Sequence, residues 1–526
     1  MRTVETVVLL VALATVVAAF AGRLSVPAPS LLVLVGLGVG LLPGAPAVHV
    51  PPELISLVVL PPLLYAASEE LALRDLRAVW LSVTVLAIGL VLVSAAVAAV
   101  VAGTVASLSV SMAFVLGAVL ASTDPVAVSA LGRRLSLPAR VQALVQAESL
   151  FNDGTSLVLF QVAVSLAVGG AASAAVPDVL VKGVAQFAAI AGGGVLAGIA
   201  AAVAAIIVRR RIIDPVLETV AALVTPYAAF LLAESLHASG VTAVIVAGLA
   251  VGRWRPKITT ARTRLQVHAV YQTLIFVLES IVFSLIGLQL PTLIRALSGL
   301  RQWLVPALAV TATLIFVRFA SVFALWAAAR WRGRTKSGWA APAVISWAGT
   351  RGVVPLAAAL SIPATTTGGN ALPGRDLVLV IAAATITLSL VTQGFTLEPL
   401  ARFAGLGNAG ATARSHEEAI ARLRLAEAAL ARLDELAECE AISDALADRV
   451  RAGLQERIDT GDETGSQESD GGTGKLTERE LRRDLIAAES AELARLADDG
   501  TISNQGRRGL QRTLDLELAR LSGTAP

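Results

Sequence analysis

The sequence predicts an all-α polytopic membrane protein, with about thirteen transmembrane helices and a helical cytoplasmic tail. Only 15% of its 526 residues are charged and its mean hydropathy is +0.74, whereas a soluble domain carries about a quarter charged residues. Apolar runs of about 20 residues, the length that crosses a bilayer as a helix, recur along the first ~400 positions. The runs are continuous rather than alternating, which indicates helices and not a barrel.

Thirteen apolar segments can be placed along the chain, with approximate boundaries. The first follows one arginine, as in a signal peptide, but further apolar segments follow at once, so we interpret it as the first span. The second, third and ninth are short enough to be partly re-entrant. The predicted spans cover residues 4–21, 28–43, 53–67, 77–102, 109–131, 139–168, 179–208, 215–236, 240–252, 268–290, 302–329, 338–361 and 376–401.

The positive charges support this arrangement. Of the 26 lysines and arginines in the first ~404 residues, 19 fall in alternate loops and five in the opposite loops, while Arg318 and Arg351 lie inside spans. Cytoplasmic loops are the ones enriched in lysine and arginine. We therefore predict a multi-pass protein of the plasma (inner) membrane, embedded in the lipid bilayer, with its C-terminus in the cytoplasm and its N-terminus outside.

A change in composition divides the chain into a transmembrane domain, 1–404, and a cytoplasmic tail, 405–526. The tail has a net charge of −8 and the membrane part +11. Leucine and alanine recur at helical spacing from His416, in a second stretch further on, and in a third from about Asn504. A segment rich in Gly, Ser, Asp and Glu near 459–475 predicts a flexible linker. The tail is either a solvated helical extension or a regulatory or dimer-contacting domain.

Several kinds of protein and site do not fit the sequence. Cys439 is the single cysteine, which excludes an intrachain disulfide and a cysteine-based metal site. The segment GGTGKLT around Lys475 resembles a phosphate-binding loop, but Ser469 and Leu476 stand where that pattern needs glycine and serine or threonine. We expect no ATP-driven pump in this chain, no cofactor and no nucleic-acid partner.

Polar residues inside the predicted spans are the candidates for function, because a charge at the bilayer centre costs about 2.5–3.5 kcal/mol on insertion scales. The fifth span holds Ser122, Thr123, Asp124 and Pro125. Proline removes one backbone donor and disfavours helical geometry at the preceding residue. We expect a broken helix whose free carbonyls face a cavity, as in transporters that coordinate cations at the midplane. A simple proline kink with a capping aspartate would leave an ionised Asp124 in lipid.

The sixth span carries a polar stripe made of Glu148, Ser149, Asn152 and Asp153. Glu148 and Asn152 are four residues apart, and so are Ser149 and Asp153, which places each pair on one helix face. Two carboxylates in one apolar environment cannot both be isolated anions, so we expect one to pair with a cation and the other to titrate or bind an ion. A solvated face at a helix end fits poorly, because leucine and valine runs flank the stripe.

Two arginines lie inside predicted spans, Arg318 in the eleventh and Arg351 in the twelfth. Arginine is always charged, so each needs an anion inside the membrane. Gly349, Gly352 and Pro355 around Arg351 predict a second irregular helix. For Arg318, the alternative is a side chain that snorkels to an interface.

The charges of these three segments do not balance. Asp124, Glu148 and Asp153 supply three negative charges, and the two arginines supply two positive ones. The carboxylate left over takes a proton or a cation of similar charge, since desolvation disfavours a bare anion, and the two ligands compete. Such competition is itself an exchange mechanism, and one proton traded for one monovalent cation is electroneutral. Glu279 in the tenth span complicates the count, because the sequence shows no obvious partner for it.

Five motifs stand in this order along the chain: STDPVAV, ESLFNDGTSLVLF, AESLHASGVTAVIVAGL, LESIVFSLIGLQL and SWAGTRGVVPLAAAL. Together they resemble the monovalent cation/proton antiporter family, which includes bacterial Na+/H+ antiporters and the animal sodium/proton exchangers. The resemblance covers about residues 5–402, and five ordered motifs are far more specific than any one alone. VVLPPLLYAAS also matches the family pattern, although Ala66 follows Tyr65 where relatives commonly have a carboxylate.

The resemblance implies a role for each residue of the polar segments. Asp153 is the carboxylate that binds the cation and the proton in turn. Thr123, through its backbone carbonyl, helps to hold the cation together with Ser149 and Asp124, the latter directly or through water. Asn152 orients the broken-helix region. An Asn-Asp pair marks the electroneutral variant of the family, in agreement with the charge count.

The resemblance also implies a structural ion pair between Glu148 and Arg318, and a role for Arg351 at the Asp124 region. The implied fold has thirteen spans in two inverted repeats, crossed unwound helices and a dimer interface on a separate bundle. A homodimer is therefore expected, with the core bundle moving against the dimer bundle during transport.

We thus expect a secondary transporter, not an enzyme, that exchanges Na+ for H+ and serves pH homeostasis. K+/H+ exchange by the same fold stays open, as does Li+, because these ions all prefer oxygen ligands and differ in the cavity they fit. A cation channel and a membrane scaffold whose tail binds partners are the remaining alternatives. The scaffold has no need of five buried ionisable groups.

Overall fold

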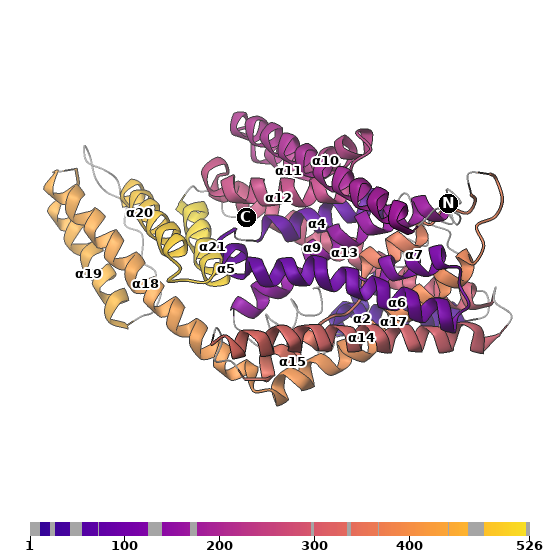
Figure 1. Cartoon of the computed structure of the whole chain (residues 1–526). Helices are drawn as coiled ribbons and strands as arrows, with labels where there is room; N and C mark the ends of the chain where they lie inside the picture. The colour runs from indigo at the N-terminus through magenta and orange to yellow at the C-terminus, as the bar shows by residue number, and fades with distance from the viewer. Residues whose placement is uncertain are drawn as a thin grey trace. The chain divides into compact units, whose positions relative to one another are not determined.

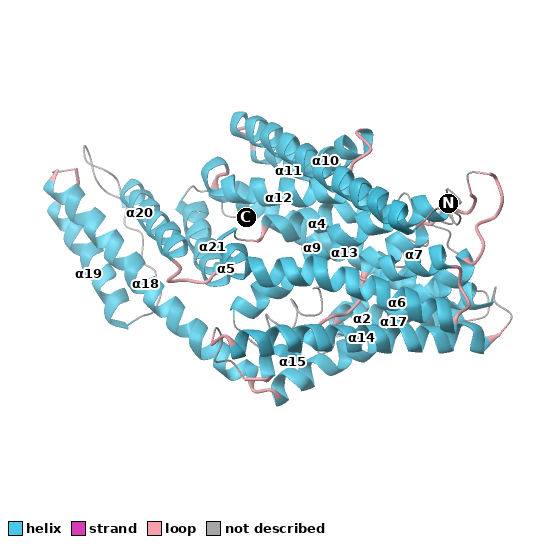
Figure 2. Cartoon of the chain, in the orientation of Figure 1, coloured by secondary structure: helices cyan, strands magenta, loops and turns pink. Residues whose placement is uncertain are grey.

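A computed structural model of the chain is helical in nearly all of the part that it describes (Figure 2). The described residues contain no strand, and one isolated antiparallel bridge joins Thr365 to Ala371. The predicted all-α class is confirmed. The described residues are 11–20, 27–42, 55–71, 73–124, 139–168, 176–295, 299–333, 338–366, 368–439, 441–460 and 478–521.

Seven described helices are long and apolar enough to cross a membrane. One of them is continuous through α5, the π-helix η2 and α6. Of the first predicted span, 4–21, only residues 11–20 are described. Membrane crossing by many helices is thus supported, and the count of thirteen stays a prediction. The seven are α5–η2–α6 (Leu73–Thr84, Val85–Leu90, Val91–Val105), α9 (Ala139–Val168), α10 (Val176–Arg211), α11 (Pro215–Ser235), α13 (Ala261–Arg295), α14 (Leu300–Trp331) and α17 (Arg375–Phe403).

Shorter apolar helices fill the remaining predicted spans. Helix α12 continues to Ile258, beyond the predicted end of its span at residue 252. These helices are α2 (Ala28–Leu41), the π-helix η1 (Ile55–Val59) continued by α4 (Leu60–Glu69), α7 (Val110–Leu120), α12 (Gly240–Ile258), α15 (Ala340–Trp347) and α16 (Val353–Leu360).

Both predicted irregular spans contain non-helical residues in their described parts. Helix α7 ends at Leu120 and the chain is no longer helical by Asp124, while α15 and α16 are separated by a non-helical segment at 348–352. Pro125 and the rest of that predicted span, up to residue 138, lie outside the described residues. The two interruptions meet, because the Asp124 amide donates to the Thr350 carbonyl at 2.7 Å and the Thr350 hydroxyl donates to the Asp124 carbonyl at 3.0 Å. The non-helical residues after α7 therefore meet the break between α15 and α16.

The chain forms two compact units, which are described separately. The first comprises Met1–Ile213, Val220–Ile258 and Val270–Gly407. The second contains the tail from Asn408 onward, together with two short segments, Asp214–Thr219 and Thr259–Ala269. The two segments include the first turns of α11 and α13.

Within the first unit, packed helix pairs surround α9. Helix α7 packs on α6 and on α9, α14 packs on α6 and α17, and α12 packs on α4 and α10 (Figure 1). A cluster of buried apolar side chains, with Val145 of α9 at 1% exposure, joins α9 to η2, α14, α15 and α17. Helix α9 is therefore buried on several sides, which is why its polar stripe is enclosed by protein.

The second unit contains four tail helices, whereas three helical stretches were predicted. The first predicted stretch is two helices: one ends at Glu438 and the next begins at Asp444. The first of them begins at Leu406, ten residues before His416. Two apolar clusters hold the helices together, and α20 lies beside α21 (Figure 1). The predicted linker lies almost entirely outside the described residues, as does the GGTGK segment. The tail helices are α18 (Leu406–Glu438), α19 (Asp444–Thr460), α20 (Glu478–Asp499) and α21 (Asn504–Leu521).

Two glycines on α2 provide a matched test of helix packing. A Cβ at Gly36 would lie 2.3 Å from the backbone oxygen of Ser284 on α13, whereas a Cβ at Gly38 would have no atom within 4 Å. We expect Gly36→Ala to lower the apparent melting temperature in detergent by several degrees, since overpacking costs about 1–3 kcal/mol. Gly38→Ala should leave it unchanged or slightly higher. Equal melting temperatures for the two variants would contradict this packing.

Candidate functional site

The polar stripe of α9 lies against the interruption that follows α7. The Ser122 hydroxyl donates to Oδ1 of Asp153, and both residues are buried, at 1% and 6% exposure. One turn away, the Ser156 hydroxyl donates to the Ala118 carbonyl at 2.7 Å, which joins α9 to the last turns of α7. The Asp153 carboxylate therefore lies beside the non-helical residues that follow α7, where these meet the break between α15 and α16.

A network of hydroxyl and amide groups continues from this carboxylate along α9. The Thr123 and Ser149 hydroxyls are 3.2 Å apart. The Asn152 amide nitrogen donates to the Thr123 hydroxyl at 3.2 Å and to Oε1 of Glu148 at 3.0 Å. The Asn152 oxygen is buried and, in the described part of the chain, has no hydrogen-bond partner. It is an acceptor that a bound cation could use.

Glu148 is neutralised by Arg318 of α14. The guanidinium donates in a fork, from Nη1 to Oε1 at 2.6 Å and from Nη2 to Oε2 at 2.9 Å. It also donates to the carbonyl of Ile345 at the end of α15, from Nη2 at 3.2 Å. Both side chains are at most 2% exposed, so Arg318 does not snorkel to an interface. Gly349 makes room for this arginine, because a Cβ there would lie 2.3 Å from the Arg318 Cδ.

Arg351 lies in the break between α15 and α16 and donates to backbone oxygens. Its Nε donates to the Leu120 carbonyl at 3.1 Å, where α7 ends, and its Nη1 donates to the Gly349 carbonyl. The last carbonyls of a helix have no partner inside the helix and carry partial negative charge, so a buried cation is stabilised there. Gly352 lies against the Asp124 carboxylate, since a Cβ would lie 1.5 Å from Oδ2. Only glycine fits at this position.

The structure thus brings all eight predicted residues to one region. Hydrogen bonds join five of them to one another: Thr123, Glu148, Ser149, Asn152 and Arg318. Asp153 bonds to Ser122, the neighbour of Thr123, Arg351 bonds to the Leu120 carbonyl at the end of α7, and Asp124 lies against Gly352. Among the described residues, no lysine or arginine forms an ion pair with Asp153, whereas Glu148 has Arg318. The groups around Asp153 offer hydroxyl, amide and carboxylate oxygens, the ligands that alkali cations prefer. The arrangement can hold either a proton or a monovalent cation on one carboxylate.

Sequence reasoning named Ser122 among the polar residues of the fifth span but gave it no role, and it missed two further contributors, Thr350 and Ser389. Thr350 adjoins the predicted Arg351, so its position in the motif was the available signal. Ser389 of α17 accepts a hydrogen bond from the Arg351 amide at 3.1 Å, and nothing in the local sequence indicates this contact. Glu279 is partly buried on α13 and takes no part in the bonds described above.

A second buried polar cluster lies on helices α4, α10, α12 and α13. The rings of Tyr65 and Tyr271 stack with centroids 6.1 Å apart, and Glu69 lies 3.7 Å from the guanidinium of Arg255. Arg209, in the last turn of α10, is only 1% exposed. Arg209 and Arg255 lie in the last turns of α10 and α12, beyond the predicted ends of the two spans. No carboxylate–hydroxyl arrangement like that of Asp153 is found among the described residues of this cluster.

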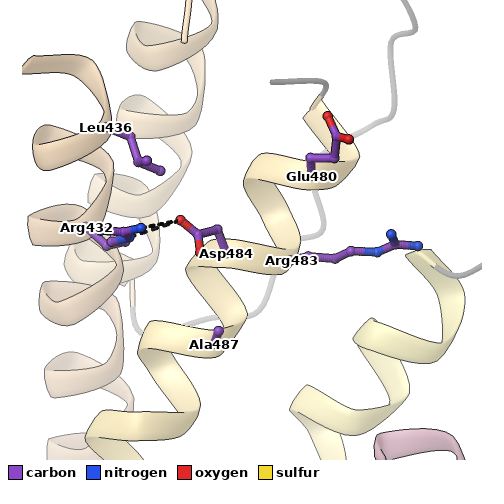
Figure 3. Close-up of a pocket in the computed structure, with 6 residues that line it drawn as sticks. All are labelled: Arg432, Leu436, Glu480, Arg483, Asp484 and Ala487. Carbon is purple, nitrogen blue, oxygen red and sulfur yellow. Dashed lines mark hydrogen bonds and ion pairs between the residues drawn. The ribbon is translucent and has the colours of Figure 1, made fainter. Parts of the chain in front are cut away.

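The tail contains a hollow of about 440 Å3 between α18 and α20 (Figure 3). Arg432 pairs with Asp484 across it at 2.9 Å, and Arg483 points away from it to donate to the Leu521 carbonyl. Its charged groups are thus used in contacts within the tail, and it offers no arrangement comparable with the site on α9. Its lining residues are Arg432, Leu436, Glu480, Arg483, Asp484 and Ala487.

Comparison with known proteins identifies the family. The family described as sodium/hydrogen exchanger, transmembrane, matches residues 8–403, which include every residue of the site on α9, after α7 and in the break between α15 and α16. The chain belongs to the sodium/hydrogen exchanger family. The family membership predicted from five motifs is confirmed.

Relatives of this exchanger extend over most of its length. An uncharacterized Na+/H+ exchanger of Mycobacterium tuberculosis is 34% identical over 98% of this chain and 95% of its own. The Na+/H+ antiporter ApNhaP of Aphanothece halophytica is 33% identical over 78% of this chain and 75% of its own. The similarity to the mycobacterial protein therefore includes the tail.

A solved structure supports the predicted fold of the exchanger. The sodium proton antiporter MjNhaP1 of Methanocaldococcus jannaschii matches with a TM-score of 0.62 over 76% of this chain and 98% of its own. The sequence identity is 22%, so the likeness concerns the fold.

The buried pair of Glu148 and Arg318 can be tested by a double-mutant cycle. Removing one partner of a buried ion pair costs about 3–5 kcal/mol because a bare charge stays behind. We expect Arg318→Met to lower the apparent melting temperature in detergent strongly, and Glu148→Gln combined with Arg318→Met to recover part of the loss. Arg402→Met is the control, since Arg402 pairs with Glu398 but is 65% exposed and should matter little. Strictly additive losses in the double variant would argue against the pair.

Proposed function

We propose that this exchanger is a secondary antiporter that trades Na+ for H+, with Asp153 as the group that both ions bind. The proposal is supported by a difference between the two carboxylates on α9. Glu148 is paired with Arg318, whereas in the described structure Asp153 has a serine hydroxyl and no cationic partner. A buried carboxylate without a cation needs a proton or a metal ion to be stable.

Competition for Asp153 gives the exchange. When the carboxylate is protonated, it is neutral and the Ser122 hydroxyl satisfies one oxygen. When the proton leaves, Na+ takes its place, with Asp124, Ser149 and the backbone of Thr123 supplying further oxygens. Asn152 holds these groups in register through its bonds to Thr123 and Glu148. Because the site cannot be bare in the low-dielectric interior, one ion crosses only in exchange for the other.

We also propose an orientation in the membrane and a homodimeric assembly. Arginines 209–211 lie in the last turn of α10, which fits the cytoplasmic side by the positive-inside rule. We accordingly place the tail in the cytoplasm and the N-terminus outside, and we expect a homodimer in the plasma membrane.

The assignment of Asp153 predicts the loss of exchange in Asp153→Asn. The substitution keeps the shape of the side chain and removes the charge that a cation needs. The measurement is the pH change inside proteoliposomes that contain a pH-sensitive dye, after addition of Na+, Li+ or K+ outside. We expect at least a hundredfold loss of rate for every cation that the wild type transports, and the same three traces give the ion selectivity.

Asp376→Asn is the matched control, because Asp376 is a 75% exposed carboxylate at the start of α17. It should exchange like the wild type. Full exchange by Asp153→Asn would disprove the assigned site, and cation flux without any pH change in the wild type would favour a channel instead.

The site also predicts an electroneutral cycle. Asp153 carries one proton or one monovalent cation, so the charge of the site is the same in both loaded forms. With equal K+ on both sides of the vesicles, valinomycin clamps the membrane potential at zero, and we expect the initial rate of exchange to be unchanged by it. An electrogenic cycle would speed up on clamping, since each net charge moved against 100 mV requires about 2.3 kcal/mol.

A further inference from the structure

Asp515 of the tail helix α21 is joined to the start of α13, inside the second compact unit. Arg264 donates from Nε to Oδ2 of Asp515 at 2.9 Å, and its Nη2 donates to Oδ1. The two side chains are 17% and 5% exposed, so the pair is largely removed from solvent. A forked, shielded pair of this kind is geometrically specific, whereas exposed pairs contribute little.

The guanidinium of Arg264 joins three parts of the chain. Its Nη1 donates to the Thr259 carbonyl at 2.7 Å, and Thr259 follows directly after the end of α12. The Asp515 carboxylate also accepts from Gln511, one turn earlier on α21, at 3.1 Å. Thr263, beside Arg264, is fully buried. Thr259, the first turn of α13 and the tail helix α21, all within the second unit, are therefore joined by one guanidinium.

Helix α12 in turn contacts α9 beside the carboxylate proposed to bind the ions. A Cβ at Gly154, the residue after Asp153, would lie 3.4 Å from Cδ1 of Ile245 on α12. The Ile245 side chain is thus part of the wall next to the site. Alternating access requires one group of helices to move against another that stays in place. The wall can serve as the fixed surface only if its end is anchored.

We propose that Asp515 is a positioning residue, which anchors the connection between α12 and α13 through Arg264 and thereby sets the rate of exchange at Asp153. This proposal rests on the exchange function proposed above. It makes the tail a support of the transport cycle and not a solvated extension. The other ion pairs of the tail differ, because they join tail residues to one another; Arg451, for example, bonds to Asp434 and Asp448.

The test compares Asp515→Asn with the wild type in proteoliposomes. We expect the maximal rate of Na+-driven proton movement to fall at least threefold. The Na+ concentration for half-maximal rate should stay the same, because the groups around Asp153 are untouched. Arg264→Gln should have the same effect, and the double variant should be no slower than either single variant, since both remove one contact. Asp515→Glu keeps the carboxylate and should recover most of the rate.

Glu517→Gln is the matched control. Glu517 lies two residues further along α21 and pairs with Arg482 of α20 at 2.5 Å, so its partner lies within the tail. It should keep the wild-type rate. Hydrogen exchange of the segment 259–269 reports the anchor without any transport, and we expect faster exchange there in Asp515→Asn and not in Glu517→Gln.

Failure of the positioning role and failure of the Asp153 assignment give different results in these experiments. An Asp515→Asn variant with freed 259–269 amides and the wild-type maximal rate would overturn the positioning role and leave the Asp153 assignment intact. Unchanged hydrogen exchange in 259–269 would overturn the anchor itself. Full exchange by Asp153→Asn would instead refute the proposed function, while the hydrogen-exchange comparison would still test the anchor.

Discussion

A charge inside a membrane protein must be neutralised, and this constraint arranges the polar residues of the exchanger. Glu148 satisfies it with the forked bonds of Arg318, and Arg351 satisfies it with the carbonyl oxygens of Leu120 and Gly349. Asp153 is left with a hydroxyl donor in the described structure. Its negative charge therefore favours the binding of a proton or a cation.

The backbone creates the place where this can happen. Helix α7 stops at Leu120, and the break between α15 and α16 meets it through the two hydrogen bonds of Asp124 and Thr350. Broken helices are tolerated at membrane depth only where protein or a cavity satisfies their free backbone groups. Here the two breaks satisfy each other in part, and glycines at 349 and 352 let Arg318 and Asp124 approach closely.

Local patterns in the sequence were sufficient for the helices and for most of the site. The apolar runs predicted the helices, and the i,i+4 spacing predicted the shared face of Glu148, Ser149, Asn152 and Asp153. Contacts between distant segments left no such signal. Three such contacts depend on how helices pack. They are the hydrogen bond from the Arg351 amide to Ser389, the pairing of Arg264 with Asp515 across 251 positions, and the burial of Arg209. The break between α18 and α19 was missed because charged residues and alanine continue through it.

If one carboxylate binds either a proton or a cation, binding of the cation must release the proton, and this release can be measured. Na+ is added to the purified protein in weakly buffered detergent solution, and the released protons are measured with a pH-sensitive dye. We expect one proton released for each Na+ bound, and neither binding nor release in Asp153→Asn. Na+ binding without proton release in the wild type, or release that persists in the variant, would contradict it.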